Sequence, residues 1–169
     1  MADHFEGKRF KKNQFVVQEG MPVPNDFWVV EGCLKAFVID NNGKEHIIQF
    51  AMENWWITDY EAYFNEVPAT ISIDCIEDCK LLALTLGNRR KICQKFHKMD
   101  RFFSVKFNYG YIRLQQRILS LLKQSAEEKY RNLIEQYPEL VQRVPKKYLA
   151  AYLGVSRETL SRVDLSKSE

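Results

Sequence analysis

Arginine is missing from most of the first half of this sequence: none lies between Arg9 and Arg89. Residues 10–88 contain five lysines and twelve acidic residues, a net charge of −7. Residues 89–169 contain eighteen lysines and arginines and eight acidic residues, a net charge of +10. The overall charge of +3 is therefore an average over two opposite parts. This asymmetry predicts a basic module with a polyanionic partner, joined to an acidic module with a different role.

Other absences exclude whole classes of protein. No run approaches the ~18 apolar residues that a membrane helix needs, and the polar residues 1–10 lack the apolar core of a signal peptide. With 46% hydrophobic and 28% charged residues, and only 7 glycines and 5 prolines, the chain is neither disordered nor fibrous. We expect a soluble cytoplasmic protein without a membrane partner.

Cysteine and histidine are too few and too scattered for a metal or redox site. Three residues separate Cys75 from Cys79, which is not the spacing of common zinc or redox pairs. His4, His46 and His97 form no cluster of the kind that a cupin-like metalloenzyme requires. No catalytic constellation has motif support. We therefore predict buried thiols, no catalytic residues, no metal ion and no cofactor.

Residues 14–86 read as a succession of short strands. Alternating, β-branched or aromatic runs of strand length occur at 27–30, 34–39, 46–52 and 70–75. Glu31-Gly32 and Asn42-Gly43 provide turn signals between the first three runs. Because no helical crossover intervenes, the pattern predicts an antiparallel sandwich or barrel.

The second half of the chain has helical periodicity. Residues 88–97 predict a short helix, and Asp100 is the predicted N-cap of a long helix that runs to Gln124. Residues 126–136 predict a further helix, which Pro138 would end.

The long helix has two apolar faces, and each needs a partner. One face comprises Phe103, Phe107, Tyr111, Leu114, Ile118 and Leu121. The other comprises Val105, Tyr109, Ile112, Leu119 and Leu122. We predict that one face packs on the sheet and that the first face meets a second copy of the chain in a homodimer. The alternative is a helix buried entirely by its own domain.

Residues 145–162 have the pattern of two helices joined by a tight turn. Pro145 suits a helix start, Gly154 can adopt the left-handed turn conformation, and Ser156 can cap the second helix. The outward positions of that helix suit base edges in a major groove: Arg157, Glu158, Ser161 and Arg162. Three further side chains are placed to bind phosphates: Lys146, Ser156 and Thr159. A generic helical hairpin is the alternative interpretation.

The segment GVSRETLSR at residues 154–162 resembles the recognition-helix motif of the Crp/Fnr superfamily, the cAMP-receptor-protein type of bacterial transcription regulators. The resemblance implies an α+β chain with an antiparallel β-roll (a double-stranded β-helix of the cyclic-nucleotide-binding type) at 1–98. A dimerisation helix at 99–125 and a helix-turn-helix domain at 126–169 would follow. It also implies a homodimer that binds double-stranded DNA at a near-palindrome, contacts RNA polymerase and responds to an effector. The sequence ends seven residues after Arg162, so we expect no β-wing.

Cyclic-nucleotide binders of this superfamily hold the phosphate with a Gly-Glu pair and, further along, an Arg-Ser or Arg-Thr pair. The corresponding positions here carry Thr58-Asp59 and Ala69-Thr70. A cyclic phosphate needs a charge-assisted donor, so we expect neither cAMP nor cGMP to bind. The effector pocket would instead be aromatic and polar, made by Trp55, Trp56, Thr58, Asp59, Ala69 and Thr70. Its ligand would be an apolar or aromatic molecule or a protein, unless these aromatic residues belong to the core.

Two other functions stay open on the sequence alone. One is a dimeric β-roll that binds a ligand or a protein but not DNA, distinguished by whether binding depends on duplex sequence. The other is a cupin-like metalloenzyme, distinguished by stoichiometric metal in the purified protein.

Overall fold

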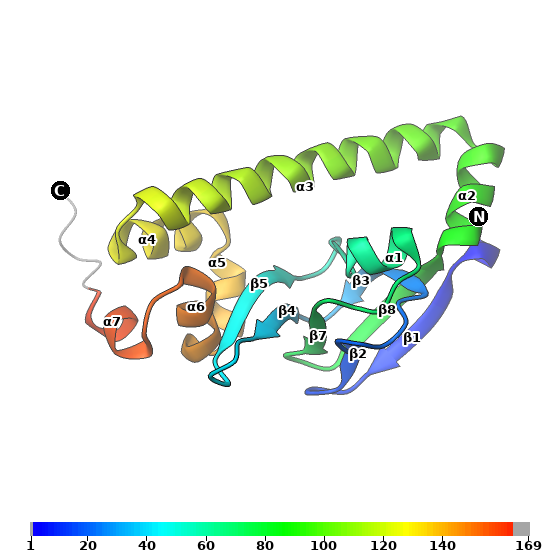
Figure 1. Cartoon of the computed structure of the whole chain (residues 1–169). Coiled ribbons are helices and arrows are strands. Elements are labelled where there is room, and N and C mark those ends of the chain that lie inside the picture. Colours follow the sequence, from blue (N-terminus) through cyan, green and yellow to red (C-terminus); the bar gives the residue numbers. More distant parts are fainter. Residues whose placement is uncertain (1, 164–169) are drawn as a thin grey trace. The chain divides into compact units, whose positions relative to one another are not determined.

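The computed structural model describes residues 2–163 of the chain. It consists of two compact units, of which the first ends at Asp100 and the second starts at Arg101. All strands of the described residues lie in the first unit, and the second unit is helical (Figure 1). The predicted absence of a wing concerns residues 164–169, which lie outside the described residues.

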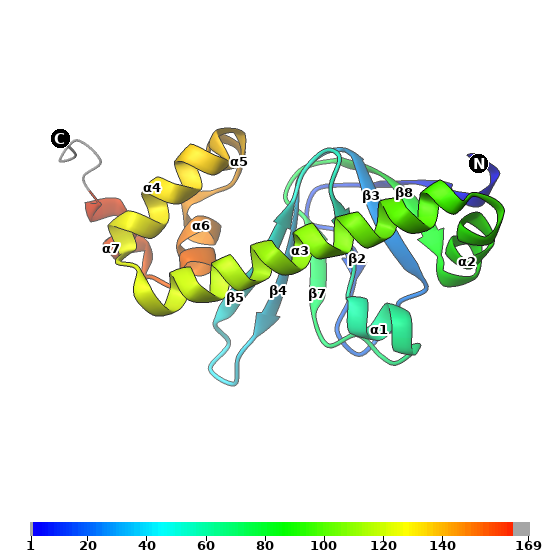
Figure 2. The same ribbon diagram turned by 90° about the horizontal axis from the view of Figure 1, so that it is seen from above.

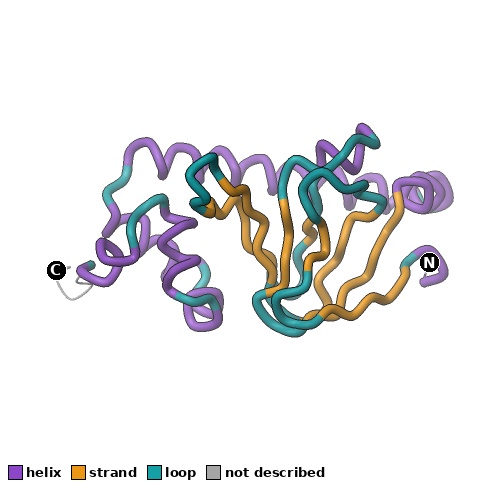
Figure 3. The backbone as a smooth tube through the Cα atoms, turned by 60° about the horizontal axis from the view of Figure 1, so that its bottom comes forward, coloured by secondary structure: helices purple, strands orange, loops and turns teal. Residues whose placement is uncertain are grey.

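The first unit is a roll of two four-stranded sheets (Figure 3). One sheet has the order β1-β8-β3-β6, with strands Glu6–Phe10, Cys79–Thr85, Asn25–Glu31 and Trp56–Ile57. The other has the order β2-β7-β4-β5, with strands Phe15–Val17, Ser72–Cys75, Leu34–Ile39 and Glu45–Ala51. Every pairing is antiparallel, which confirms the predicted architecture. β4 coincides with a predicted run, and the other three predicted runs differ from their strands by one or two residues.

The inward faces of both sheets form the core of the roll. Val29, Leu34, Ile73 and Leu81 are almost completely buried there. The predicted turn at Gly32 has a φ of +107°, and a Cβ at this position would lie 2.6 Å from the Cys79 sulfur. Only glycine fits, because both the backbone conformation and the available space exclude a side chain.

The alternation of apolar and polar residues at 70–75 predicts that polar side chains face water, but those of β7 are partly or fully buried. Ile73 and Cys75 are buried as expected, but Ser72 is buried as well. The Ser72 hydroxyl accepts a hydrogen bond from the backbone N–H of Glu19 at 3.1 Å. Asp74 is half-buried and forms an ion pair with the Lys35 ammonium at 3.1 Å. Ser72 thus keeps a hydrogen bond, and Asp74 an ion pair, away from water.

Strands β2, β6 and β8 lie within the strand region predicted at 14–86 but match none of the four predicted runs. Three further short elements do not fit the predicted succession of strands. They are the 3₁₀ helix η1 at Ala2–His4, strand β1, and helix α1 at Tyr60–Asn65. α1 has only six residues, too few to display a helical period. It is defined instead by its ends, because Asp59 caps its N-terminus and Glu66 ends it in the left-handed conformation with a φ of 55°.

Two helices follow the roll. α2 spans Leu86–Lys95, two residues earlier than predicted, because Thr85 caps it by accepting from the N–H of Asn88 at 3.1 Å. α3 spans His97–Lys123. The prediction of Asp100 as its N-cap is wrong, because α3 starts at His97 and Asp100 lies in its first turn. An acidic side chain there interacts favourably with the helix dipole.

Four shorter helices complete the second unit (Figure 2). They are α4 at Ala126–Gln136, α5 at Pro138–Arg143, α6 at Lys146–Leu153 and α7 at Arg157–Arg162. α4 has the predicted bounds. Pro138 was expected only to end it, but Pro138 also begins α5, because proline suits the first turn of a helix. α4, α6 and α7 pack on one another around Tyr130, Leu133, Leu149 and Leu160. No helix in the described part of the chain has the length and apolarity needed to cross a bilayer.

Candidate nucleic-acid interface and effector site

The turn between α6 and α7 is built around Gly154. This residue has a φ of 68° and caps α6, with its N–H directed at the carbonyls of Ala150 and Ala151. The next N–H, of Val155, donates to the carbonyl of Ala150 at 3.0 Å. The left-handed conformation satisfies the last carbonyls of α6 while it reverses the chain.

Ser156 starts α7 as its N-cap. Its hydroxyl oxygen accepts from the N–H of Thr159 at 3.0 Å and lies 2.9 Å from the Thr159 hydroxyl. Both residues are exposed, so their hydroxyls can still be approached from outside. Leu160 is buried and anchors α7 on the rest of the unit. Lys146, the third residue predicted to bind phosphate, is exposed in the first turn of α6.

The residues predicted to read bases share the exposed side of α7. This group comprises Arg157, Glu158, Ser161 and Arg162. A hydrogen bond from its own backbone N–H lowers the pKa of Glu158, helped by the Ser156 hydroxyl and by two neighbouring arginines. The Glu158 carboxylate accepts hydrogen bonds, whereas the neighbouring Arg157 and Arg162 side chains donate them. This alternation suits the edges of base pairs, which present both acceptors and donors.

Asp59 is the main polar feature of the predicted effector pocket. One carboxylate oxygen accepts from the N–H of Ala62 at 3.1 Å. The other accepts from the N–H and hydroxyl of Thr70 at 2.7 and 2.9 Å and from the N–H of Ile71 at 3.2 Å. Burial acts to raise the pKa of Asp59, but these hydrogen bonds outweigh it and hold the pKa below its usual value. A carboxylate of the chain itself therefore occupies a set of anion-binding donors.

The other residues of the predicted pocket contact different parts of the roll. The Thr58 hydroxyl is buried and donates to the carbonyl of Asn25 at 2.9 Å. Trp56 packs edge-on against Trp28, with ring centroids 5.3 Å apart, on the face of its sheet opposite the buried Ile57. Trp55 lies against the core, Ala69 is buried and Thr70 is bound to Asp59.

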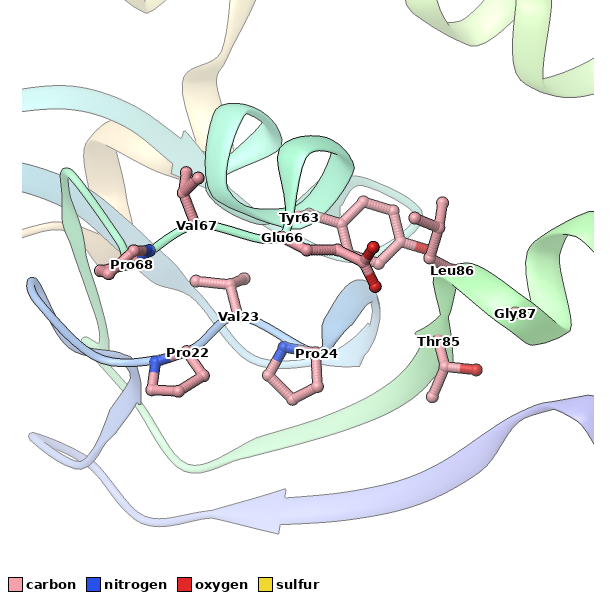
Figure 4. A pocket seen from close by; sticks show the side chains of 10 residues that line it. All are labelled: Pro22, Val23, Pro24, Tyr63, Glu66, Val67, Pro68, Thr85, Leu86 and Gly87. Carbon is pink, nitrogen blue, oxygen red and sulfur yellow. The ribbon is translucent and has the colours of Figure 1, made fainter.

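A cavity of about 550 Å³ lies elsewhere on the roll, at residues that the sequence did not predict as a site. Figure 4 shows its lining: Pro22, Val23, Pro24, Tyr63, Glu66, Val67, Pro68, Thr85, Leu86 and Gly87. None of the predicted pocket residues belongs to it. The only sequence signal was the pair of proline-containing loops, at 22–24 and 67–68, which contact each other through a bridge between Pro22 and Pro68.

A second buried aspartate was also missed. Asp26 of β3 is 1% exposed, and one of its oxygens lies 3.3 Å from Arg89 of α2. Its other oxygen has no hydrogen-bond partner. Burial raises the pKa of Asp26 to about 7, against the opposing charge of Arg89. Sequence offered no signal, because the two residues are 63 positions apart.

The predicted dimer face of α3 is exposed apart from its first member. Phe103 is buried, whereas Phe107, Tyr111, Leu114, Ile118 and Leu121 are between 37% and 70% exposed. The residues of the second apolar face are exposed as well. An exposed apolar stripe of this length on one helix is typical of a surface that associates with another protein surface.

The metal-ligating side chains and the thiols of the described residues have the following arrangement. Within residues 2–163, no group of three or more histidine, cysteine or acidic side chains is arranged to hold a metal ion. All four cysteines are thiols: Cys33, Cys75 and Cys79 are buried, and Cys93 is half-buried.

The fold has well-defined relatives. The sequence profile of the cyclic nucleotide-binding domain matches residues 7–96. A search of curated protein sequences found no significant match. FixK2 from Bradyrhizobium japonicum superposes with a TM-score of 0.80 at 14% identity, covering 94% of this chain and 82% of its own. The c-di-GMP-responsive global regulator CLP from Xanthomonas campestris gives a TM-score of 0.75 at 14% identity, covering 95% and 85%. The catabolite activator protein from Thermus thermophilus gives 0.60 at 20% identity, covering 95% and 77%.

Proposed function

The chain belongs to the cyclic nucleotide-binding domain family, and from this premise we propose that it is a homodimeric, sequence-specific DNA-binding transcription regulator of the Crp/Fnr type. The observation that carries the proposal is the α6–Gly154–α7 arrangement, in which a capped second helix exposes arginine and glutamate side by side. The shared fold with FixK2 and CLP supports it. The proposed organisation is a β-roll at 1–98, a dimerisation helix at 99–125 and a helix-turn-helix domain at 126–169.

In this proposal α7 enters the major groove as the recognition helix. Arg157 and Arg162 donate to guanine, Glu158 accepts from cytosine, and Ser161 contacts either kind of edge. Phosphates are bound by Lys146 at the start of α6 and by the hydroxyls of Ser156 and Thr159, which fix the register of docking. The positive charge of the second half of the chain supports this placement.

A second copy supplies the other recognition helix. The face of α3 from Phe107 to Leu121 packs against the same face of the partner, which removes its exposed apolar side chains from water. The two recognition helices then reach successive major grooves, about 34 Å apart, of a near-palindromic site. RNA polymerase is a further proposed partner once the dimer is bound.

We propose that the effector is neither cAMP nor cGMP. The Asp59 carboxylate already takes the N–H groups of Ala62, Thr70 and Ile71. A phosphate brought to these donors would face a second anion, with no arginine between residues 10 and 88 to compensate. The roll therefore responds to a different ligand or to a protein.

The DNA-binding proposal is tested by titrating fluorescent duplexes, selected by the protein from a random pool, against scrambled duplexes at several salt concentrations. Arg157→Ala and Arg162→Ala each reduce the preference for the selected duplex by about tenfold or more, because each removes a base contact. Lys146→Ala weakens binding to both duplexes equally and reduces the salt dependence by about one counterion.

The matched control is Arg101→Ala, which removes the same charge from an exposed position of α3. It leaves the preference unchanged. If the wild-type protein selects no duplex, or if both recognition-helix variants retain full preference, the proposal is wrong.

A further inference from the structure

Three residues of α3 spaced four apart contact three successive parts of the second unit. They are Arg113, Arg117 and Leu121, which we name the α3 contact line. A spacing of four places them on one side of the helix. This side borders the exposed apolar face, and Leu121 belongs to both.

The two arginines of the line lie near the rings of two tyrosines. The Arg117 guanidinium lies 3.5 Å from the ring centroid of Tyr152, on α6. Arg113 lies 5.8 Å from the ring centroid of Tyr137, which stands between α4 and α5. Arg117 is half-buried, and burial lowers its pKa. Cation–π contacts stabilise most where the cation is desolvated, which makes the pair formed by Arg117 and Tyr152 the stronger one.

The third residue of the line reaches the turn itself. A Cβ on Gly154 would lie 3.5 Å from a methyl group of Leu121, so this side chain packs directly on the turn that joins α6 to α7. From the other side, the Lys129 ammonium of α4 donates to the Leu153 carbonyl at 3.4 Å, in the last turn of α6. The α6–α7 pair is therefore contacted on α6 and at its turn.

We propose that the α3 contact line fixes the direction of α7 relative to α3 and thereby sets the half-site spacing that the dimer reads. This inference rests on the proposed function. Its residues are positioning residues, because they act on DNA through the orientation of α7 and not by touching bases. A small rotation of the α6–α7 pair displaces both recognition helices, so loss of the line relaxes the spacing and leaves the base preference within each half-site intact.

The test compares four variants with the wild type. Arg117→Ala and Tyr152→Leu remove the stacked pair, Tyr152→Phe keeps the aromatic face, and Arg101→Ala is the charge-matched control. Each full-length protein selects from a pool of duplexes in which the half-site separation varies by single base pairs. We expect one preferred separation for the wild type, Tyr152→Phe and Arg101→Ala. We expect several accepted separations, with an unchanged half-site sequence, for Arg117→Ala and Tyr152→Leu.

Hydrogen exchange in the same proteins tests the positioning without DNA. In Arg117→Ala and Tyr152→Leu, amides of α6 and α7 exchange about fivefold faster than in the wild type, while those of the roll are unchanged. Unchanged exchange in α6 and α7, or an unchanged single separation in duplex selection, overturns the inference. If the wild type selects no duplex, the proposed function fails, and the exchange result still decides whether the line holds α6 and α7.

Discussion

Two buried aspartates show how strongly a single residue depends on its surroundings. Asp59 accepts hydrogen bonds from three backbone N–H groups and a hydroxyl, and its pKa is lowered. Asp26 has one arginine neighbour and an oxygen without a partner, and burial raises its pKa to about 7. The same side chain is thus a stable anion at one place in the roll and a titrating group at another.

The raised pKa of Asp26 predicts a loss of stability as the pH rises. The folded chain holds the Asp26 proton up to a pH of about 7, whereas the unfolded chain releases it near 3.8. Between these values the folded state binds more protons, so the free energy of unfolding falls as pH increases. In the wild type we expect the free energy of unfolding to fall by an amount on the order of 2–4 kcal/mol between about pH 4 and pH 7, and we expect this fall to be absent in Asp26→Asn. Urea unfolding at a series of pH values measures it.

The two tyrosines near Asp26 do not titrate in this pH range, so the pH dependence can be attributed to Asp26. Burial raises the pKa of both Tyr60 and Tyr63 above the usual value, so both stay neutral in this range. Glu19→Gln, an exposed change from acid to amide, is the control and keeps the wild-type slope. An Asp26→Asn profile parallel to that of the wild type would contradict the prediction.

At the scale of elements, the long helix α3 exposes many apolar side chains. It has 27 residues, and apolar side chains are exposed on two of its faces. A helix with such faces is stable in water only when another surface covers them. The proposed dimer covers the face from Phe107 to Leu121.

This proposal predicts different effects on the two faces. Ile118→Asp places a charge in the proposed dimer interface and raises the dimer dissociation constant by about a hundredfold, because the carboxylate must be desolvated there. Ile112→Asp places the same charge on the other face, where the residue is exposed to a similar degree, and has a much smaller effect. Sedimentation equilibrium distinguishes them. Equal dissociation of both variants, or of neither, would refute the assignment of the interface.

At the scale of the whole molecule, the two parts of the chain with different proposed roles carry opposite net charges. The acidic residues 10–88 make up most of the roll, and the basic residues 89–169 include α3 and the helices that would present arginines to DNA. Under the proposed function, the basic part would attract phosphates and the acidic part would repel them.

The division predicts that the full chain binds duplex DNA but not cyclic nucleotides. We expect calorimetric titration with cAMP or cGMP to give no binding heat up to millimolar ligand. Asp59 occupies backbone N–H donors such as that of Thr70, and residues 10–88 contain no arginine that could bind the phosphate. A selected duplex titrated into the same preparation serves as the positive control. A dissociation constant of about 1 mM or tighter for either nucleotide would disprove this expectation.

Much of this organisation is local and could be predicted from the sequence. Strand β4, helix α4, the Gly154 turn and the Ser156 cap depend on apolar periodicity, positive φ and capping within a few residues. The charge division is a property of the sequence itself. These features follow from interactions between near neighbours, which the order of residues specifies directly.

Contacts between distant residues were decided only by the tertiary structure. The donors that Thr70 and Ile71 provide to Asp59, the pair formed by Asp26 and Arg89, and the stacking of Arg117 on Tyr152 join separate elements. Such pairs form only after the chain has reversed direction several times, and no local propensity encodes which side chains then meet. For this reason the sequence predicted a recognition helix, while the structure alone shows the contacts between α3 and the α6–α7 pair and the hydrogen bonds that Asp59 accepts.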